Sequence, residues 1–148
     1  EGREPQRAIA ELKGRDWDFL IANIVNWIEV RGVIADKEPA SADNIVTSLR
    51  AAFEDAKVKG VILRINSPGG SPVQAGLIND EIRRLRARHP ETPLYAVVED
   101  ICASGGYYIA AAADRIYVSR ASIIGSIAKR PAAISKIAPG KDSPSSKP

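Results

Sequence analysis

The sequence predicts a single α/β domain with a mainly parallel sheet. Strand-like and helix-like patterns alternate from about residue 28 to residue 118, which is the order of elements in such a domain. One strand-like run, Val61–Ile65, is short, β-branched and almost wholly apolar, as in a strand that is buried on both faces of a parallel sheet. With 148 residues, 45% of them hydrophobic and 26% charged, the chain has the size and composition of one globular domain.

The first strand and helix are predicted between residues 28 and 60. Ile28–Ile34 begins with alternating apolar and polar residues, which indicates a strand. Ser41 can cap a helix, because apolar residues recur after it at helical spacing; they are Ile45, Val46, Leu49, Ala52 and Phe53. Gly60 ends this connection and leads into the strand Val61–Ile65.

The same pattern then repeats. Ser67–Ser71, which contains one proline and two glycines, is predicted to be a turn. Ser71 is a second capping residue and Pro72 suits the first position of a helix. We expect that helix to end at His89, before Pro90; its apolar stripe consists of Ile78, Ile82 and Leu85.

Three more elements complete the predicted domain. Leu94–Val98 is a strand, a helix of small residues runs from Ser104 to about Ala113, and Arg115–Val118 is a further strand. Parallel strands joined by helices require crossover connections, which we expect to be right-handed.

The two ends of the chain differ from its middle. Residues 1–27 are predicted to be a polar lead-in, 28–127 the domain, and 128–148 an irregular tail rich in Lys, Pro, Ser and Gly. The sequence begins with Glu and contains no methionine, so we expect a fragment or a processed piece. No signal peptide or apolar run of membrane-spanning length is visible, so any membrane anchor is expected upstream.

Composition excludes several classes of function. The net charge is only +3, and the arginines of residues 83–88 lie among acids without interleaved aromatic residues, which favours a solvated helix face over nucleic-acid binding. A single cysteine excludes an internal disulfide and a paired-cysteine metal site. We therefore expect no cofactor, no metal and no nucleic acid as a partner.

Chemistry in parallel α/β sheets is found at the carboxyl ends of strands, and two such ends stand out. After Val61–Ile65, the glycines of Ser67–Ser71 leave amide groups unscreened by side chains, which suits an anionic oxygen. After Leu94–Val98, Ser104 opens a helix, where the helix dipole stabilises a developing oxyanion. Ser104 by itself fits two interpretations, a nucleophile or a simple helix cap.

A serine nucleophile needs a base to take its proton. The only histidine, His89, falls at the exposed end of an arginine-rich helix and is poorly placed. The Gly-x-Ser-x-Gly motif is absent, because Cys102 and Gly106 flank Ser104. Lysine is the remaining base, provided that desolvation lowers its pKa. Cys102 is expected to pack inward rather than to act as the nucleophile.

Taken together, three motifs resemble the signal peptide peptidase A (SppA) family from about Ile28 to Ile127. They are Lys59–Ser71, which holds the Ser-Pro-Gly-Gly sequence; Cys102–Asp114, which holds Ala-Ser-Gly-Gly-Tyr-Tyr; and Gly125–Ile127. The resemblance implies a ClpP/crotonase-like spiral of ββα units, here C-terminally incomplete. It also implies a serine endopeptidase at the outer side of the bacterial cytoplasmic membrane, facing the periplasm or cell exterior. Such proteins form homo-oligomers and cut apolar, membrane-derived peptides such as cleaved signal peptides.

By the same resemblance, Ser104 matches the nucleophile, and the amides of Gly70 and Gly105 match the oxyanion hole. The general base departs from the family pattern. Gly140–Pro144 resembles a contracted form of the stretch that carries the family's lysine, so Lys141 is the candidate base. Lys129, Lys136 and a lysine lost by truncation or frameshift remain alternatives.

Two other functions stay open. The irregular tail favours a non-catalytic, truncated family member that oligomerises or binds peptides. The third class is a crotonase-type acyl-CoA enzyme, which would share the fold and a two-amide oxyanion hole but needs no serine nucleophile.

Overall fold

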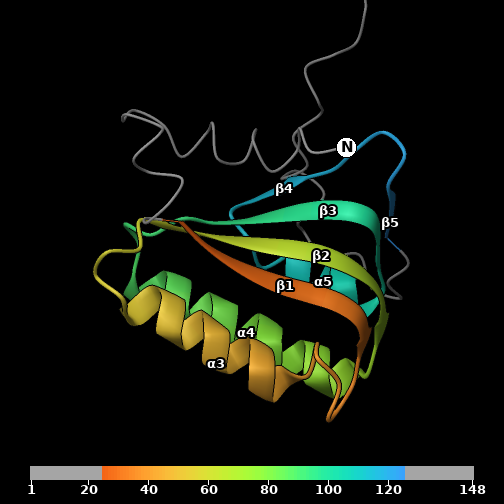
Figure 1. Cartoon of the computed structure of the whole chain (residues 1–148), viewed down its shortest axis with the longest axis horizontal. Coiled ribbons are helices and arrows are strands. Elements are labelled where there is room, and N and C mark those ends of the chain that lie inside the picture. Colours follow the sequence, from red (N-terminus) through yellow and green to blue (C-terminus); the bar gives the residue numbers. More distant parts are fainter. Residues whose placement is uncertain (1–24, 126–148) are drawn as a thin grey trace, which may run out of the picture.

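The computed structural model describes residues 25–125, which form a parallel sheet with helices on one face (Figure 1). The predicted lead-in up to residue 24 and the predicted tail lie outside the described residues. In chain order the elements are β1 (Val25–Ile34), α3 (Ala42–Glu54), β2 (Gly60–Gly70), α4 (Pro72–Arg88), β3 (Leu94–Ala103), α5 (Gly105–Ala110), β4 (Arg115–Tyr117) and β5 (Ile123–Gly125).

The sheet confirms the predicted α/β class. Its strand order is β1-β2-β3-β4, β5 pairs with the end of β3, and every pairing is parallel. β1 begins three residues before the predicted strand, so Val25–Trp27 belong to the sheet and not to the lead-in. The short strand β5 was not predicted from the sequence.

β2 and β3 are both longer than predicted, and this corrects the interpretation of Ser67–Ser71 as a turn. β2 continues through Gly70, although its pairing with β1 shifts register between Arg31 and Val33. Its pairing with β3 shifts between Ile65 and Ser67. The Ser-Pro-Gly-Gly sequence is therefore a bent continuation of β2, and it stays alongside the end of β3.

The helix starts follow the predicted caps. The hydroxyl of Ser41 accepts a hydrogen bond from the N–H of Asn44, and that of Ser71 accepts one from the N–H of Gln74. α4 ends at Arg88 with His89 as its C-cap, as predicted. α5 is shorter than predicted, because the alanine-rich segment after Ala110 forms turns instead.

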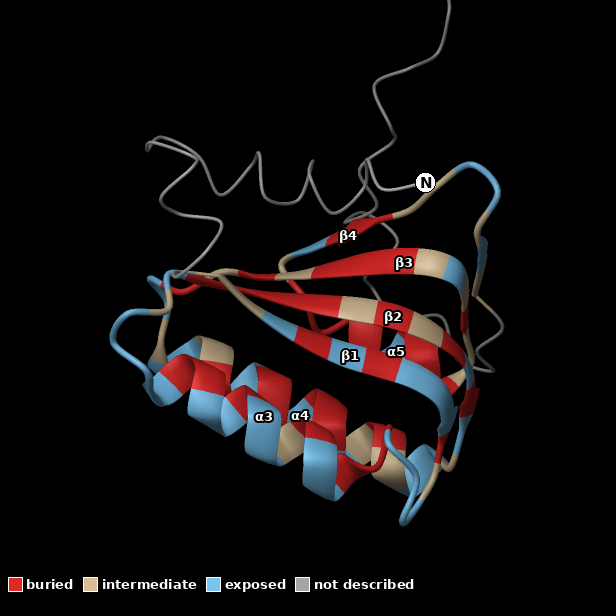
Figure 2. Cartoon of the chain, in the orientation of Figure 1, coloured by how far each residue is buried: buried red, intermediate tan, exposed pale blue. Residues whose placement is uncertain are grey.

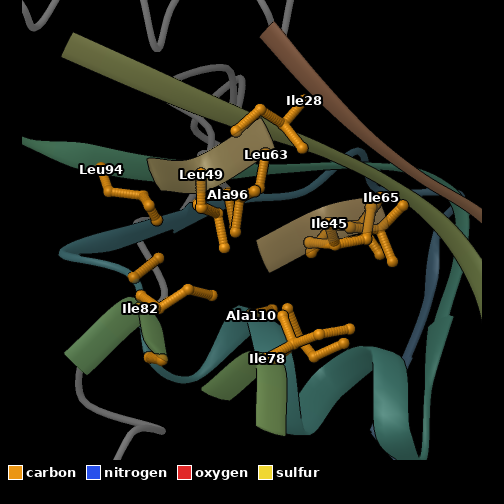
Figure 3. Close-up of a cluster of buried hydrophobic side chains, with 14 of the residues drawn as sticks. Ile28, Ile45, Leu49, Leu63, Ile65, Ile78, Ile82, Leu94, Ala96 and Ala110 are labelled. Carbon is orange, nitrogen blue, oxygen red and sulfur yellow. The ribbon is translucent and has the colours of Figure 1, made fainter. Parts of the chain in front are cut away.

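The main core lies between the sheet and the helices α3, α4 and α5 (Figures 2 and 3). Each layer contributes fully buried aliphatic side chains: Leu49 from α3, Leu63 from β2, Ile82 from α4 and Ile109 from α5. Burial of such side chains is the main favourable term in folding, at about 1.5–3 kcal/mol each. The sheet is thereby fixed above α4 and α5, and the carboxyl ends of β2 and β3 are held against the start of α5.

The opposite face of the sheet is more polar near β1. Arg31 donates to Glu99 at 2.7 Å, Arg64 pairs with Glu29 at 3.4 Å, and Arg64 also contacts Glu99. These side chains are exposed or half-buried, so each pair contributes little to stability. Among residues 25–125, this face holds a small apolar cluster in which Ile62, Val97 and Tyr117 are buried.

The arginines of α4 form ion pairs within the domain. Arg84 pairs with Glu81, and Arg86 contacts Asp114 and donates to the carbonyl of Ala112. Arg83 and Arg88 are exposed, as expected for a solvated helix face. Arg86 thus links α4 to the segment between α5 and β4, whereas Arg84 pairs within α4.

Glu81 is the one strongly perturbed carboxyl group among the described residues. Its carboxylate accepts hydrogen bonds from Arg84 and from Arg50 of α3 at 2.6–2.8 Å, and only 7% of the residue is exposed. The hydrogen bonds with Arg84 and Arg50 lower the pKa of Glu81 from 4.5 to about 2. A carboxyl group whose pKa is lower in the folded state adds stability above its unfolded pKa and loses it as the pH falls.

We therefore expect the free energy of unfolding to fall by about 1–2 kcal/mol between pH 4.5 and pH 2 because of Glu81 alone. This is less than the pKa change implies, because Arg50 and Arg84 are about half exposed. Urea unfolding at several pH values should show Glu81→Gln less stable than the unmodified chain at pH 7 and close to it near pH 2. Asp80→Asn, at the exposed neighbouring position, is the control; a pH-independent difference for Glu81→Gln would contradict the account.

Candidate active site

Ser104 stands at the junction between β3 and α5, where the carboxyl end of the sheet meets a helix start. Its backbone has φ 50° and ψ −119°, a conformation that residues with a side chain rarely adopt. Such a conformation costs about 1–3 kcal/mol and persists only where the surroundings enforce it. Here the N–H of Ser104 donates to the carbonyl of Gly125 at 2.8 Å, and its carbonyl accepts from Tyr108.

Ser104 occupies the N-cap position of α5 without acting as a cap. Within the described part of the chain, its hydroxyl makes no capping hydrogen bond, whereas Ser41 and Ser71 both cap their helices. The residue is half-buried. The cap interpretation therefore does not explain the hydroxyl, which stays at the carboxyl edge of the sheet.

A sharp strand-to-helix turn with a strained serine is the geometry of a nucleophile elbow, although the Gly-x-Ser-x-Gly motif is absent. The residue that packs against this serine belongs to another strand, β2, and is a glycine. A Cβ atom on Gly69 would lie 2.7 Å from the Cβ of Ser104 and 2.8 Å from the nitrogen of Gly105. Glycine is required at position 69 because the end of β2 packs directly against the serine.

The glycines Gly70 and Gly105 both lie beside Ser104. Gly70 is the last residue of β2, and the N–H of Ser71, which follows it, donates to the carbonyl of Ile34 in β1 at 2.7 Å. Gly105 is the first residue of α5, and its N–H has no partner within the helix.

The two glycines also lie close together. A Cβ atom on Gly105 would be 3.6 Å from the nitrogen of Gly70. Two backbone N–H groups beside a serine at a helix start can donate hydrogen bonds to a negatively charged oxygen. The sequence-predicted residues Ser104, Gly70 and Gly105 are thus brought together at one edge of the sheet.

Neither His89 nor Cys102 fits a catalytic role in this geometry. His89 follows the last turn of α4, whereas Ser71 and the glycines of β2 precede its first turn, so about 25 Å of helix separates them. The ring of His89 lies beside Phe53, with their centroids 5.7 Å apart. Cys102 is fully buried, and burial raises the pKa of its thiol to about 12. Its thiol is therefore not an activated nucleophile.

The candidate bases Lys141, Lys129 and Lys136 lie outside the described residues. Within residues 25–125 the lysines are Lys37, Lys57 and Lys59, all exposed. A lysine that acts as a base must be desolvated, and none of these three is buried.

The sequence did not reveal two supports of the site. The first is β5, in which the carbonyl of Gly125 accepts a hydrogen bond from the N–H of Ser104. The sequence feature that could have indicated this strand is the Gly125–Ile127 motif, but it follows β4 too closely to suggest a separate strand. The second is Ser67, which is fully buried below the glycines. Its place beside Pro68 and Gly69 made it look like part of a surface turn.

Comparison with solved structures places the fold among the ClpP-like proteins. A ClpP1 mutant from Listeria monocytogenes matches with a TM-score of 0.55 at 19% identity, over 66% of this chain and 53% of its own. A mutant of a membrane-bound stomatin-specific protease matches with a TM-score of 0.52 at 20% identity, over 68% and 45%. At these identities the matches establish the fold alone, and they confirm the predicted ClpP/crotonase-like class.

Sequence comparison then identifies similar proteins. Residues 86–128 match the model of peptidase family S49. A protein described as a signal peptide peptidase SppA, from Enterococcus faecium, is 36% identical over 108 residues, which cover 68% of this chain and 31% of that protein. Protease 4 of Haemophilus influenzae is 36% identical over 123 residues, covering 80% and 20%. The predicted resemblance is confirmed: residues 86–128 match peptidase family S49, and the chain is similar to SppA and Protease 4 proteins over 68–80% of its length.

A third relative carries a different name. The Na(+)/H(+) antiporter NhaA of Brucella melitensis is 49% identical over 79 residues, which cover 53% of this chain but only 11% of the antiporter. The chain spans 11–31% of the length of these three relatives. Within residues 25–125, no helix is long and apolar enough to cross a membrane.

Proposed function

We propose that this chain carries the nucleophile of a serine endopeptidase and that Ser104 attacks the peptide carbonyl. The observation that supports this most strongly is the strained backbone of Ser104, with φ 50° and a hydroxyl that caps nothing. A stable fold holds such a conformation where the surroundings over-determine it, and residues of this kind cluster at active sites. The family match and the names of the relatives support the same class of enzyme.

In the proposed reaction, Ser104 Oγ forms a bond to the carbonyl carbon while its proton passes to a neutral lysine amine. The oxyanion that forms accepts hydrogen bonds from the N–H groups of Gly70 and Gly105. The lysine then returns the proton to the leaving amine as the C–N bond breaks. Water hydrolyses the resulting ester of Ser104 and frees the second product.

Lys141 is the proposed base, with Lys129 and Lys136 as the other candidates in the chain. The support for a lysine is indirect: His89 lies at the far end of α4, and the Cys102 thiol is buried. The proposed substrates are apolar, membrane-derived segments such as cleaved signal peptides, and the proposed assembly is a homo-oligomer associated with a membrane. These proposals rest on the resemblance to SppA proteins.

The base can be tested by the pH dependence of hydrolysis of a fluorogenic apolar peptide. A lysine base must be neutral, so kcat/KM should rise with pH through the alkaline range and level off above the pKa of that lysine. Lys141→Ala should lower kcat about 10²-fold or more and abolish this rise, whereas Lys57→Ala, at an exposed position before β2, should change neither. An inflection near pH 6.5 that disappears in His89→Ala would contradict a lysine base.

A further inference from the structure

Ser67 is a buried hydroxyl that joins three parts of the candidate site. The residue is 0% exposed and lies in β2 where the pairing with β3 shifts register. Its Oγ donates to the carbonyl of Gly32 at 2.6 Å and accepts from the N–H of Gly69 at 3.1 Å. A hydroxyl has a single proton, so Ser67 uses its proton in the bond to Gly32 and accepts in the bond from Gly69.

The bond to Gly32 connects Ser67 to an irregularity in β1. Gly32 has φ 79° and lies between Arg31 and Val33, where the β1–β2 register shifts. A bulge of this kind leaves backbone groups without ladder partners. The hydroxyl of Ser67 donates a hydrogen bond to the Gly32 carbonyl and so links the bulge in β1 to the bend in β2.

The bond from Gly69 bears directly on the proposed oxyanion hole. Gly69 has φ 99° and packs against Ser104, and the next N–H in the chain is that of Gly70. The bond to Gly69 fixes the peptide unit between Pro68 and Gly69, directly before the unit that carries the N–H of Gly70. Ser67 also lies under the first turn of α5, where a Cβ atom on Gly106 would meet its carbonyl oxygen at 3.1 Å.

From these contacts we infer that Ser67 is a positioning residue, which holds the N–H of Gly70 in line with that of Gly105 so that both can meet one oxyanion. This inference rests on the proposed function of Ser104. The hydroxyl of Ser67 touches no reacting atom in this scheme. Its effect is on the transition state, where the oxyanion forms, and little on the binding of the peptide.

The test compares two side chains of nearly equal volume at position 67 of the 148-residue chain. Ser67→Thr keeps the hydroxyl and Ser67→Val removes it, so both carry the same additional bulk. We expect Ser67→Val to lower kcat for the fluorogenic peptide about 10- to 100-fold relative to Ser67→Thr, with KM changed less than about twofold. Affinity for a peptide aldehyde, whose adduct with serine carries the oxyanion, should fall by the same factor. Equal kcat values, or a change confined to KM, would overturn the inference.

A second pair of variants covers the possibility that the larger side chains prevent folding. Ser67→Ala removes the hydroxyl without adding bulk, and Ser41→Ala removes another buried hydroxyl, the one that caps α3. Both should lower stability, but only Ser67→Ala should lower kcat and aldehyde affinity together. If both variants lower kcat by the same factor, Ser67 acts on stability alone and the inference fails.

The same variants separate this inference from the proposed function. An unmodified chain without Ser104-dependent hydrolysis would contradict the proposed function. In that case the amide NMR signals of Gly70 and Gly105 decide the role of Ser67. If these amide signals differ from those of the unmodified chain in Ser67→Val but not in Ser67→Thr, Ser67 positions the glycines. Equal spectra for the two variants overturn the inference.

Discussion

Ser104→Ala is expected to lower the rate of peptide hydrolysis about 10⁴-fold or more while leaving the fold intact. Loss of a serine nucleophile removes the covalent route, and the remaining rate comes from the oxyanion hole and substrate binding. The measurement is kcat/KM for a fluorogenic apolar peptide, with circular dichroism to confirm folding. Because alanine carries the same backbone strain as serine at φ 50°, stability should change by less than about 1 kcal/mol.

The matched control for this variant is Ser48→Ala. Ser48 is exposed on α3, and its hydroxyl donates to the carbonyl of Asn44 within the same helix. Its removal should leave the rate unchanged within about twofold. Activity that survives Ser104→Ala would assign the hydrolysis to another residue or another enzyme. Retained acyl-CoA hydration in that variant would favour the crotonase-type alternative.

Gly69→Ala is expected to damage both stability and reactivity. The new Cβ would lie 2.7 Å from the Cβ of Ser104, 2.8 Å from the nitrogen of Gly105 and 2.9 Å from the carbonyl of Ala103. Two of these three atoms belong to the backbone and cannot rotate away, and φ 99° is unfavourable for alanine. We expect a loss of about 2–4 kcal/mol in the free energy of unfolding and at least a 10²-fold loss in the rate of serine acylation.

Gly76→Ala provides the opposite expectation in the same chain. Gly76 lies inside α4, and a Cβ atom there would meet nothing within 4 Å. Alanine is the better helix former, so this variant should gain about 0.5–1 kcal/mol and keep full activity. If urea unfolding showed similar losses for both variants, close packing at Gly69 would not be the cause.

The sequence predicted the layers of the fold because each layer has a local signal. Ser41 and Ser71 mark the helix starts, and the apolar run Val61–Ile65 marks a buried strand. The ends of β2 and β3 were missed because they contain proline, glycine and small residues, which are typical of turns. Their extension depends on pairing between distant segments, such as Ser67 with Cys102, and no local pattern encodes it.

The candidate site was predicted in part for the same reason. Ser104, Gly70 and Gly105 follow from the order of strands and helices together with the family motifs, and the structure brings them together. The contact of Gly69 with Ser104, the support from Gly125 and the buried hydroxyl of Ser67 are tertiary features. Each joins residues from different strands, so each required the fold before it could be found.

The most direct test of the central claim is covalent labelling of Ser104. A fluorophosphonate probe phosphonylates an activated serine and leaves ordinary serine hydroxyls unmodified. After labelling of the 148-residue chain, protease digestion and mass spectrometry should place the probe on the peptide that contains Ser104, with no label in about 8 M urea or in Ser104→Ala. A folded chain that carries no label at Ser104 would contradict the claim and favour the non-catalytic alternative, a domain that oligomerises or binds peptides.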